Sequence, residues 1–208
     1  IDVDYYVEKE YEPYAKQIFG NTPEMMEFFS KKLNYDYPWS KYAQITGRDY
    51  VSGAMENTTA TLHQESAQQK PGDLIDENKW ENTIAHELFH HWFGDLVTAE
   101  SWSNITVNES FANYSEYLWI ENKYGKSLAD YHLMGEVKGY LADPSNPAKD
   151  LVRFNYKSRE DVFDGVSYNK GGAILHMLRN YLGDDAFFAG LTDYLKTNEY
   201  GTGEAQQL

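Results

Sequence analysis

The chain contains no cysteine, so disulfide bonds and thiolate metal sites are both excluded. No stretch reaches 18 uninterrupted apolar residues, so we expect no transmembrane helix within it. No signal peptide, internal repeat or low-complexity segment is visible either. The sequence therefore gives no reason to expect a membrane-spanning or repeat architecture.

Basic residues are scarce as well. The 18 lysines and arginines stand against 33 aspartates and glutamates, which gives a formal net charge of −15. Such a field repels a phosphate backbone, so nucleic-acid binding is not expected. The acidity has two open interpretations: it keeps the protein soluble, or it attracts cationic ligands such as the free α-amino group of a peptide.

Apolar and aromatic residues are plentiful. They make up 41% and 16% of the 208 residues, which predicts a folded globule with one sizeable core or two small lobes. The chain opens on Ile1 without an initiator methionine and stops at Leu208. We therefore expect it to be an excised or processed piece of a longer protein.

The first third of the chain changes from helical to extended patterns. Two helices are expected within residues 5–33, the second with Thr22 as N-cap and Pro23 in the first helical position. Short extended runs then predict a small sheet, at residues 42–46, 50–51 and 58–62.

Helical patterns dominate the rest of the chain. A polar loop over residues 64–78 precedes a helix expected at 80–93, which Gly94 ends. A second helix is expected at 107–123, and the remainder is helical with interruptions near residues 143–144 and 164–165. The predicted fold class is α+β, a small N-terminal sheet followed by a mostly helical lobe.

The first of these long helices carries the pattern H-E-x-x-H at His86–His90. At about 100° per residue, His86 and His90 point within about 40° of each other, so both imidazoles can reach one metal ion. Glu87 lies beside them and can reach a metal-bound water. Five positions with two wildcards also occur by chance, and the alternative is a surface helix with two histidines and a glutamate.

A third ligand is available at the start of the next helix. A catalytic zinc ion needs three protein ligands and one open position, and Glu109 follows His90 by nineteen positions. A helix pair brings that first turn back against the histidine helix. Glu116, two turns further along the same face, is our candidate partner for a ligand histidine, and Asn113 is the second choice.

The other four histidines carry weaker predictions. His91 faces about 100° away from His90 and is expected to be structural or exposed to solvent. His63, His132 and His176 have no histidine partner at the i+4 position. We expect these three to be hydrogen-bonded polar or surface residues.

Four ordered motifs resemble the gluzincin aminopeptidases of the aminopeptidase N type. The match comprises Gly53-Ala54-Met55-Glu56-Asn57, the zinc helix continuing to Thr98, Asn108-Glu109-Ser110-Phe111-Ala112, and Phe163 to Gly171 around Tyr168. The family usually has glycine at the position of Ser110 and asparagine at that of Asp95. The resemblance implies a thermolysin-like zinc peptidase catalytic domain over residues 1–208, with the family's N-terminal β-domain and C-terminal helical domain absent.

The resemblance also implies roles for single residues. One zinc ion per chain is expected on His86, His90 and Glu109, with Glu87 as general base and Tyr168 as oxyanion donor. Gly53, Ala54, Met55, Glu56 and Asn57 are expected to bind substrate, a peptide with a free N-terminus. Among them, Glu56 would hold the substrate's α-ammonium group.

The predicted function is a zinc aminopeptidase, and two alternatives stay open. One is a zinc endopeptidase or an epoxide-type hydrolase on the same scaffold. Glu56 and the Gly53-Ala54 pair argue against it, because an endopeptidase does not need the first and epoxide-hydrolysing relatives usually carry Gly-Gly. The other is a catalytically weak, peptide-binding fragment.

Overall fold

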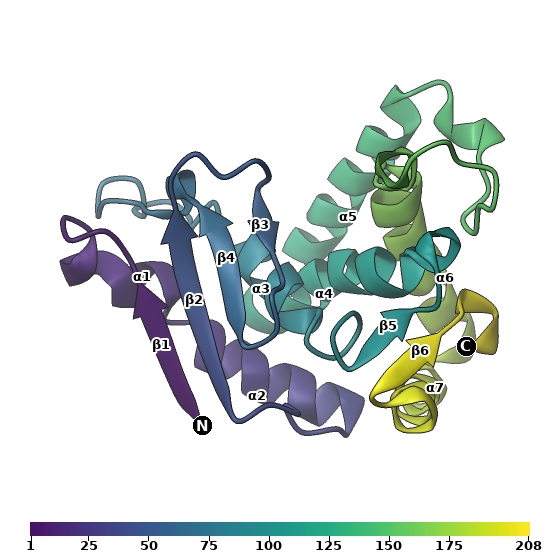
Figure 1. The fold of residues 1–208 in the computed structure, drawn as a ribbon, viewed down its shortest axis with the longest axis horizontal. Helices are drawn as coiled ribbons and strands as arrows, with labels where there is room; N and C mark the ends of the chain where they lie inside the picture. Colours follow the sequence, from purple (N-terminus) through teal and green to yellow (C-terminus); the bar gives the residue numbers. More distant parts are fainter.

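The computed structural model describes all residues 1–208. Its N-terminal part is a four-stranded mixed sheet in the order β1-β2-β4-β3, formed by β1 (Asp2–Tyr6), β2 (Lys41–Gly47), β4 (Ala60–Gln64) and β3 (Ala54–Met55). β1, β2 and β4 are parallel, whereas β3 runs antiparallel to β4 at the edge of the sheet. Figure 1 shows this sheet beside the helical part of the molecule.

Three helices pack near the sheet: α1 (Ala15–Phe19), α2 (Thr22–Leu33) and α3 (Glu81–Phe89). α2 is amphipathic and buries Met25, Phe29 and Leu33. It ends at Asn34, whose left-handed backbone (φ 45°) is a favoured helix terminator. The rings of Phe29 and Phe89 meet edge to face at 4.9 Å, which joins α2 to α3 in one core.

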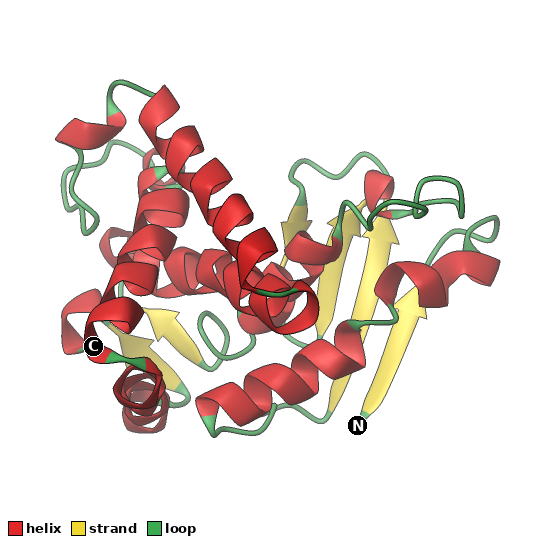
Figure 2. Ribbon diagram, turned by 180° about the vertical axis from the view of Figure 1, so that it is seen from behind, coloured by secondary structure: helices red, strands yellow, loops and turns green.

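The helical part is built around α4 (Thr106–Tyr124), most of which is buried. α3, α5 (Lys126–Ala142) and α6 (Gly171–Leu182) all pack against it, and α7 (Asp184–Asn198) packs on α6 and α2. A parallel pair of short strands, β5 (Val97–Ala99) and β6 (Gly201–Gly203), lies beside α7 (Figure 2). None of the helices combines the length and the apolar character needed to cross a membrane.

Short 3-10 turns connect these elements at Glu12–Tyr14, Glu65–Ala67, Trp102–Asn104, Asn146–Ala148 and Arg159–Val162, and another, Ala205–Gln207, follows β6. A single π-helical turn, Val166–Lys170, leads directly into α6. Through α4, the core is continuous from the sheet-packed helices to the C-terminal helices.

The expected small sheet followed by a mostly helical region is confirmed, with several local corrections. Residues 2–6 form a strand instead of entering the first helix, and residues 50–51 form no strand. Thr22 is the first residue of α2 rather than its cap, and its hydroxyl donates to Gln44 Oε1 at 2.7 Å. α3 ends at Phe89, four residues before the expected end, and the β5–β6 pair was not expected.

Candidate metal centre

Helices α3 and α4 bring three buried side chains together. His86 and His90 lie one turn apart at the end of α3, and Glu109 lies in the first turn of α4. Oε2 of Glu109 is 3.4 Å from Nε2 of His86 and 3.5 Å from Nε2 of His90. The positive end of the α4 dipole also favours a carboxylate at this position.

The other nitrogen of each imidazole has an acceptor of its own. Nδ1 of His86 donates to Oε1 of Glu116 at 2.9 Å, and Nδ1 of His90 donates to the carbonyl oxygen of Phe93 at 3.0 Å. Because a carboxylate and a carbonyl only accept, Nδ1 carries the proton in both rings. Once Nε2 is deprotonated, each ring presents its lone pair toward Glu109, which is the orientation that a metal ligand needs.

The spacing of these atoms fits a tetrahedral zinc ion. Bonds of about 2.0–2.1 Å place neighbouring ligand atoms roughly 3.3–3.4 Å apart, close to the two measured distances. Glu109 Oε2 is buried and has no hydrogen-bond partner in the protein. A buried carboxylate oxygen is costly unless a cation compensates it, so the residues present fit the metal.

The protein itself holds this cluster in a charged state. Burial lowers the pKa of His90, but the carboxylates of Glu56 and Glu109 outweigh burial and leave that pKa at about 9. Burial raises the pKa of Glu109, but His90 and His86 outweigh it and hold the pKa below its usual range. Metal binding must displace protons from the imidazoles, so metal affinity is expected to rise with pH.

Glu87 is a second buried carboxylate beside the cluster. Its Oε2 atom has no hydrogen-bond partner in the protein, and the residue lines a cleft that also contains His86 and His90. Burial raises the pKa of Glu87 to about 7, against the opposing charges of the two histidines. A carboxylate with this pKa can both accept and return a proton near neutral pH.

Tyr168 lies on the π-helical turn and faces the same cleft. Such turns insert an extra residue into a helix and are frequent at functional sites. The Tyr168 ring stacks on the His86 imidazole with 5.9 Å between centroids. Burial, and next the carboxylate of Glu109, raise the pKa of the phenol. Tyr168 therefore keeps its proton and can donate a hydrogen bond.

The cleft has a volume of about 1080 Å³, and part of its wall is the chain segment 50–56. This segment includes β3, the edge strand, whose outer side has no neighbouring strand. Gly53, Ala54, Met55 and Glu56 line the cleft, whereas Asn57 is exposed and does not. A carboxylate oxygen of Glu56 lies within 4.8 Å of ligand-type atoms of Glu87 and His90.

Comparison with known proteins decides the family. Residues 18–208 match the family model described as the peptidase family M1 domain. The chain belongs to peptidase family M1. The resemblance seen in the four sequence motifs is thereby confirmed.

Individual relatives of this M1 chain are named aminopeptidases. Aminopeptidase N of Canis lupus familiaris is 35% identical over 202 residues, and endoplasmic reticulum aminopeptidase 2 of Homo sapiens is 33% identical over 190. Aminopeptidase N of Streptomyces lividans is 34% identical over 203 residues. These matches cover 90%, 88% and 93% of the M1 chain but only 20%, 20% and 24% of the relatives. The chain spans about a fifth to a quarter of their length.

The structure distinguishes the two candidate partners of the candidate ligand histidines, His86 and His90. Glu116 contacts His86, whereas the amide of Asn113 donates to Oε2 of Glu136 on α5 at 2.8 Å. Asn113 therefore makes no hydrogen bond to His86 or His90. The sequence ranked Glu116 first but kept Asn113 as the second choice, because both lie on the Glu109 side of α4.

The remaining histidines of the M1 chain take four different environments. His91 is buried and structural, and its Nε2 accepts the backbone N–H of Thr59 at 2.9 Å. His63 is buried without a partner at either nitrogen, which corrects the expectation of a hydrogen-bonded or surface residue. His132 Nε2 lies 3.5 Å from Glu116 Oε2, and His176 Nδ1 lies 3.2 Å from the hydroxyl oxygen of Tyr114.

Sequence motifs missed part of the M1 cleft. The wall also contains residues from outside the motifs, among them Tyr50, Thr83, Trp102, Arg159 and Glu160. Trp102 packs against Phe163 with 5.9 Å between ring centroids. No local pattern marks these residues, because helix α3, the loop before β3 and two 3-10 turns bring them to the cleft from separate parts of the chain.

Proposed function

We propose that the chain is the catalytic region of a zinc aminopeptidase that hydrolyses the N-terminal peptide bond of its substrate. His86, His90 and Glu109 would hold the metal, one ion per chain. The observation that carries this proposal is the buried Glu109 Oε2, which lies 3.4 and 3.5 Å from two imidazole Nε2 atoms and makes no hydrogen bond within the protein. Family membership supports it independently.

A zinc ion on two imidazoles and one carboxylate would contribute the chemistry that zinc has in other hydrolytic sites. A zinc ion bound there supplies a Lewis acid, which polarises the scissile carbonyl and lowers the pKa of water to about 7. The remaining work belongs to side chains of the protein. Glu116 keeps the proton on Nδ1 of His86, which fixes the ring and makes it a better ligand.

Glu87 is proposed as the general base. Its free Oε2 accepts a proton from the attacking water and then delivers that proton to the nitrogen of the leaving amine. A pKa of about 7 lets the same group serve both steps. The reaction therefore needs no second acid.

Tyr168 is proposed as the oxyanion donor. Its protonated hydroxyl would donate a hydrogen bond to the oxygen that becomes negative when the carbonyl carbon turns tetrahedral. Stacking on His86 keeps the ring close to the metal ligands, which supports this role. Removal of one such donor typically costs about 10²–10³ in kcat.

Glu56 and β3 are proposed to select the N-terminus. The outer edge of β3 can pair its backbone with an extended peptide. The Glu56 carboxylate then forms a charge-assisted contact with the α-ammonium group, which fixes the first peptide bond at the reacting groups. This contact is what would distinguish an aminopeptidase from an endopeptidase on the same site.

The proposal also concerns the domain and the longer protein that contains it. The small sheet and the helical lobe on either side of the candidate zinc helix would form a thermolysin-like catalytic domain over residues 1–208. The aminopeptidases that match the chain are four to five times longer, so the proposal assigns full activity to a longer protein with flanking domains. The substrate in that protein would be a peptide with a free N-terminus.

The test compares two substrates in the complete polypeptide that contains this chain. An aminoacyl anilide with a free amine should be hydrolysed, and its N-acetylated twin should not. Zinc content measured on the same sample should be one ion per chain. Equal rates for both substrates would indicate an endopeptidase or another hydrolase, and zinc binding without turnover would indicate a binding fragment.

A further inference from the structure

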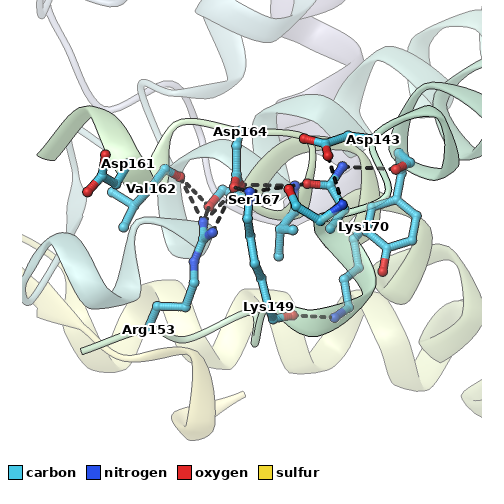
Figure 3. A network of polar contacts seen from close by, with 12 residues as sticks. Asp143, Lys149, Arg153, Asp161, Val162, Asp164, Ser167 and Lys170 are labelled. Atoms are coloured by element: carbon cyan, nitrogen blue, oxygen red, sulfur yellow. Dashed lines mark hydrogen bonds and ion pairs between the residues drawn. The ribbon is translucent and has the colours of Figure 1, made fainter. Parts of the chain in front are cut away.

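The turn that carries Tyr168 is fixed on its N-terminal side by a partly buried ion pair between Arg153 and Asp164 (Figure 3). Oδ1 of Asp164 accepts the backbone N–H groups of Val166 at 3.1 Å and Ser167 at 3.3 Å. The guanidinium of Arg153 binds both oxygens of Asp164, at 2.7 and 2.8 Å, and also donates to Oγ of Ser167 at 3.0 Å. Lys149 adds a third cationic contact to Asp164 at 2.9 Å.

A second contact ties the same turn to the helix of the candidate metal ligand. Oγ of Ser110 donates to the carbonyl oxygen of Ser167 at 2.6 Å, and both residues are buried. Ser110 directly follows Glu109 on α4. Its side chain fits only because residue 171 is glycine, where an added Cβ would lie 1.8 Å from the Ser110 hydroxyl oxygen.

A third contact lies on the C-terminal side of Tyr168. The amide of Asn169 donates to Oε2 of Glu136 at 2.5 Å, and the amide of Asn113 donates to the same oxygen at 2.8 Å. Glu136 therefore links the turn to α5 and α4 at once. Both neighbours of Tyr168 are held by polar contacts, while the Tyr168 side chain lines the cleft.

We propose that Ser110, Arg153 and Glu136 are positioning residues that set the place of the Tyr168 hydroxyl relative to Glu109 and the ligand histidines. The inference rests on the oxyanion role proposed for Tyr168. An oxyanion donor acts only within about 2.7–3.1 Å of the developing charge, and a displacement of 1 Å can cost up to about a hundredfold in rate. Three anchors from separate elements keep the π-helical turn from shifting along α6.

The test uses anchor variants in the complete polypeptide, each made alone and combined with Tyr168→Phe. Ser110→Ala and Glu136→Leu should each lower kcat about tenfold with little change in KM. In the Tyr168→Phe background, the same changes should cost almost nothing further, because the hydroxyl that they position is already gone. Glu136→Gln, unlike Glu136→Leu, should keep most of the rate of the unmodified protein, since its amide oxygen can still accept a hydrogen bond from Asn169.

Thr192→Val is the matched control. Thr192 is a buried hydroxyl that donates to the carbonyl oxygen of Leu33 at 2.6 Å, in a different part of the core. Its removal should lower the melting temperature without changing the ratio of kcat between the two backgrounds. Anchor variants that slow both backgrounds equally would overturn the inference, because this is the result of a general structural role.

Amide hydrogen exchange gives a readout that does not depend on turnover. Ser110→Ala and Glu136→Leu should speed exchange in residues 166–170 while the amides of α3 stay protected. Unchanged exchange in the turn would overturn the inference even if the rates fell. Absence of turnover in the unmodified protein would instead overturn the proposed function, so the two failures are distinguishable.

Discussion

His63 is a fully buried imidazole on β4 with no hydrogen-bond partner in the protein at either nitrogen. Burial lowers its pKa from 6.5 to about 4. Between these values the unfolded chain binds a proton that the folded protein does not. Stability therefore falls as the pH drops from about 6.5 to 4, by up to roughly 3 kcal/mol at about 1.4 kcal/mol per pKa unit.

We predict that His63→Leu removes this pH dependence and stabilises the protein. Two buried polar atoms without partners are replaced by apolar atoms beside Phe19, for a gain of about 1–3 kcal/mol at pH 7 and more at pH 5. Urea unfolding of both proteins at the two pH values measures the effect. A gain that does not grow at pH 5 would show that His63 titrates normally in the folded state.

Glu87→Gln separates catalysis from metal binding at a single residue. The amide cannot accept a proton from water, so kcat should fall about 10²–10⁴-fold. Zinc content should stay at one ion per chain, because Glu87 is not among the three proposed ligands. The measurement is turnover of a free-amine anilide alongside metal analysis, and a near-normal rate would move the base to another residue.

Glu116→Gln tests the hydrogen-bond partner of His86, a proposed metal ligand. The neutral amide accepts more weakly from Nδ1 of His86, so zinc affinity should fall about 10–100-fold. Asn113→Ala is the control on the same side of α4, and it should leave zinc affinity unchanged because Asn113 bonds Glu136 instead. Competition with a chromophoric chelator measures both affinities.

At the scale of elements, the sequence predicted those that carry a strong local pattern. α2, α3, α4, β2 and β4 were expected from periodicity and turn residues. β5 and β6 were not, because each has three residues and Val97 pairs with Gly201, more than a hundred positions away. β1 was missed because its partner, residues 41–45 of β2, also lies far from it in the sequence.

The candidate site also combines residues that local spacing predicts with residues that only long-range packing brings together. The candidate ligand histidines and Glu87 lie within one turn at the end of α3, so their spacing alone predicted that they lie together. Glu109 needed the additional assumption that two consecutive helices pack against each other. The residues that hold the Tyr168 turn could not be predicted, because Ser110, Arg153 and Glu136 reach it from three separate segments. The π-helical turn itself could not be predicted either, because the 3.6-residue pattern that marks an α-helix does not reveal it.

The edge strand β3 supports a prediction about substrate selection. Glu56→Gln should weaken binding of free-amine peptide analogues by about 1.5–3 kcal/mol, roughly tenfold to over a hundredfold. An N-acetylated analogue should bind poorly to the unmodified protein and barely respond to the change. Titration calorimetry with both analogues measures this, and equal losses would show that Glu56 supports β3 instead of reading the ammonium group.

At the scale of the whole molecule, the candidate metal centre lies where the two parts of the fold meet. α3 packs against β3 and α2 on one side and against α4 on the other, as Figure 1 shows. The three proposed ligands therefore connect the sheet-packed helix to the centre of the helical part. A metal ion held there would stabilise the junction as well as serve the chemistry.

This placement predicts that zinc removal lowers the stability of the whole fold. A ligand that binds only the folded state adds about 2.7 kcal/mol when its free concentration is a hundred times its Kd. For a protein of this length, that corresponds to a melting temperature about 5–10 °C lower after chelation. Added zinc should restore the temperature in the unmodified protein but not in His90→Ala, which lacks one proposed ligand. If chelation left the melting temperature unchanged, or if His90→Ala responded to zinc like the unmodified protein, the metal would not bind between α3 and α4.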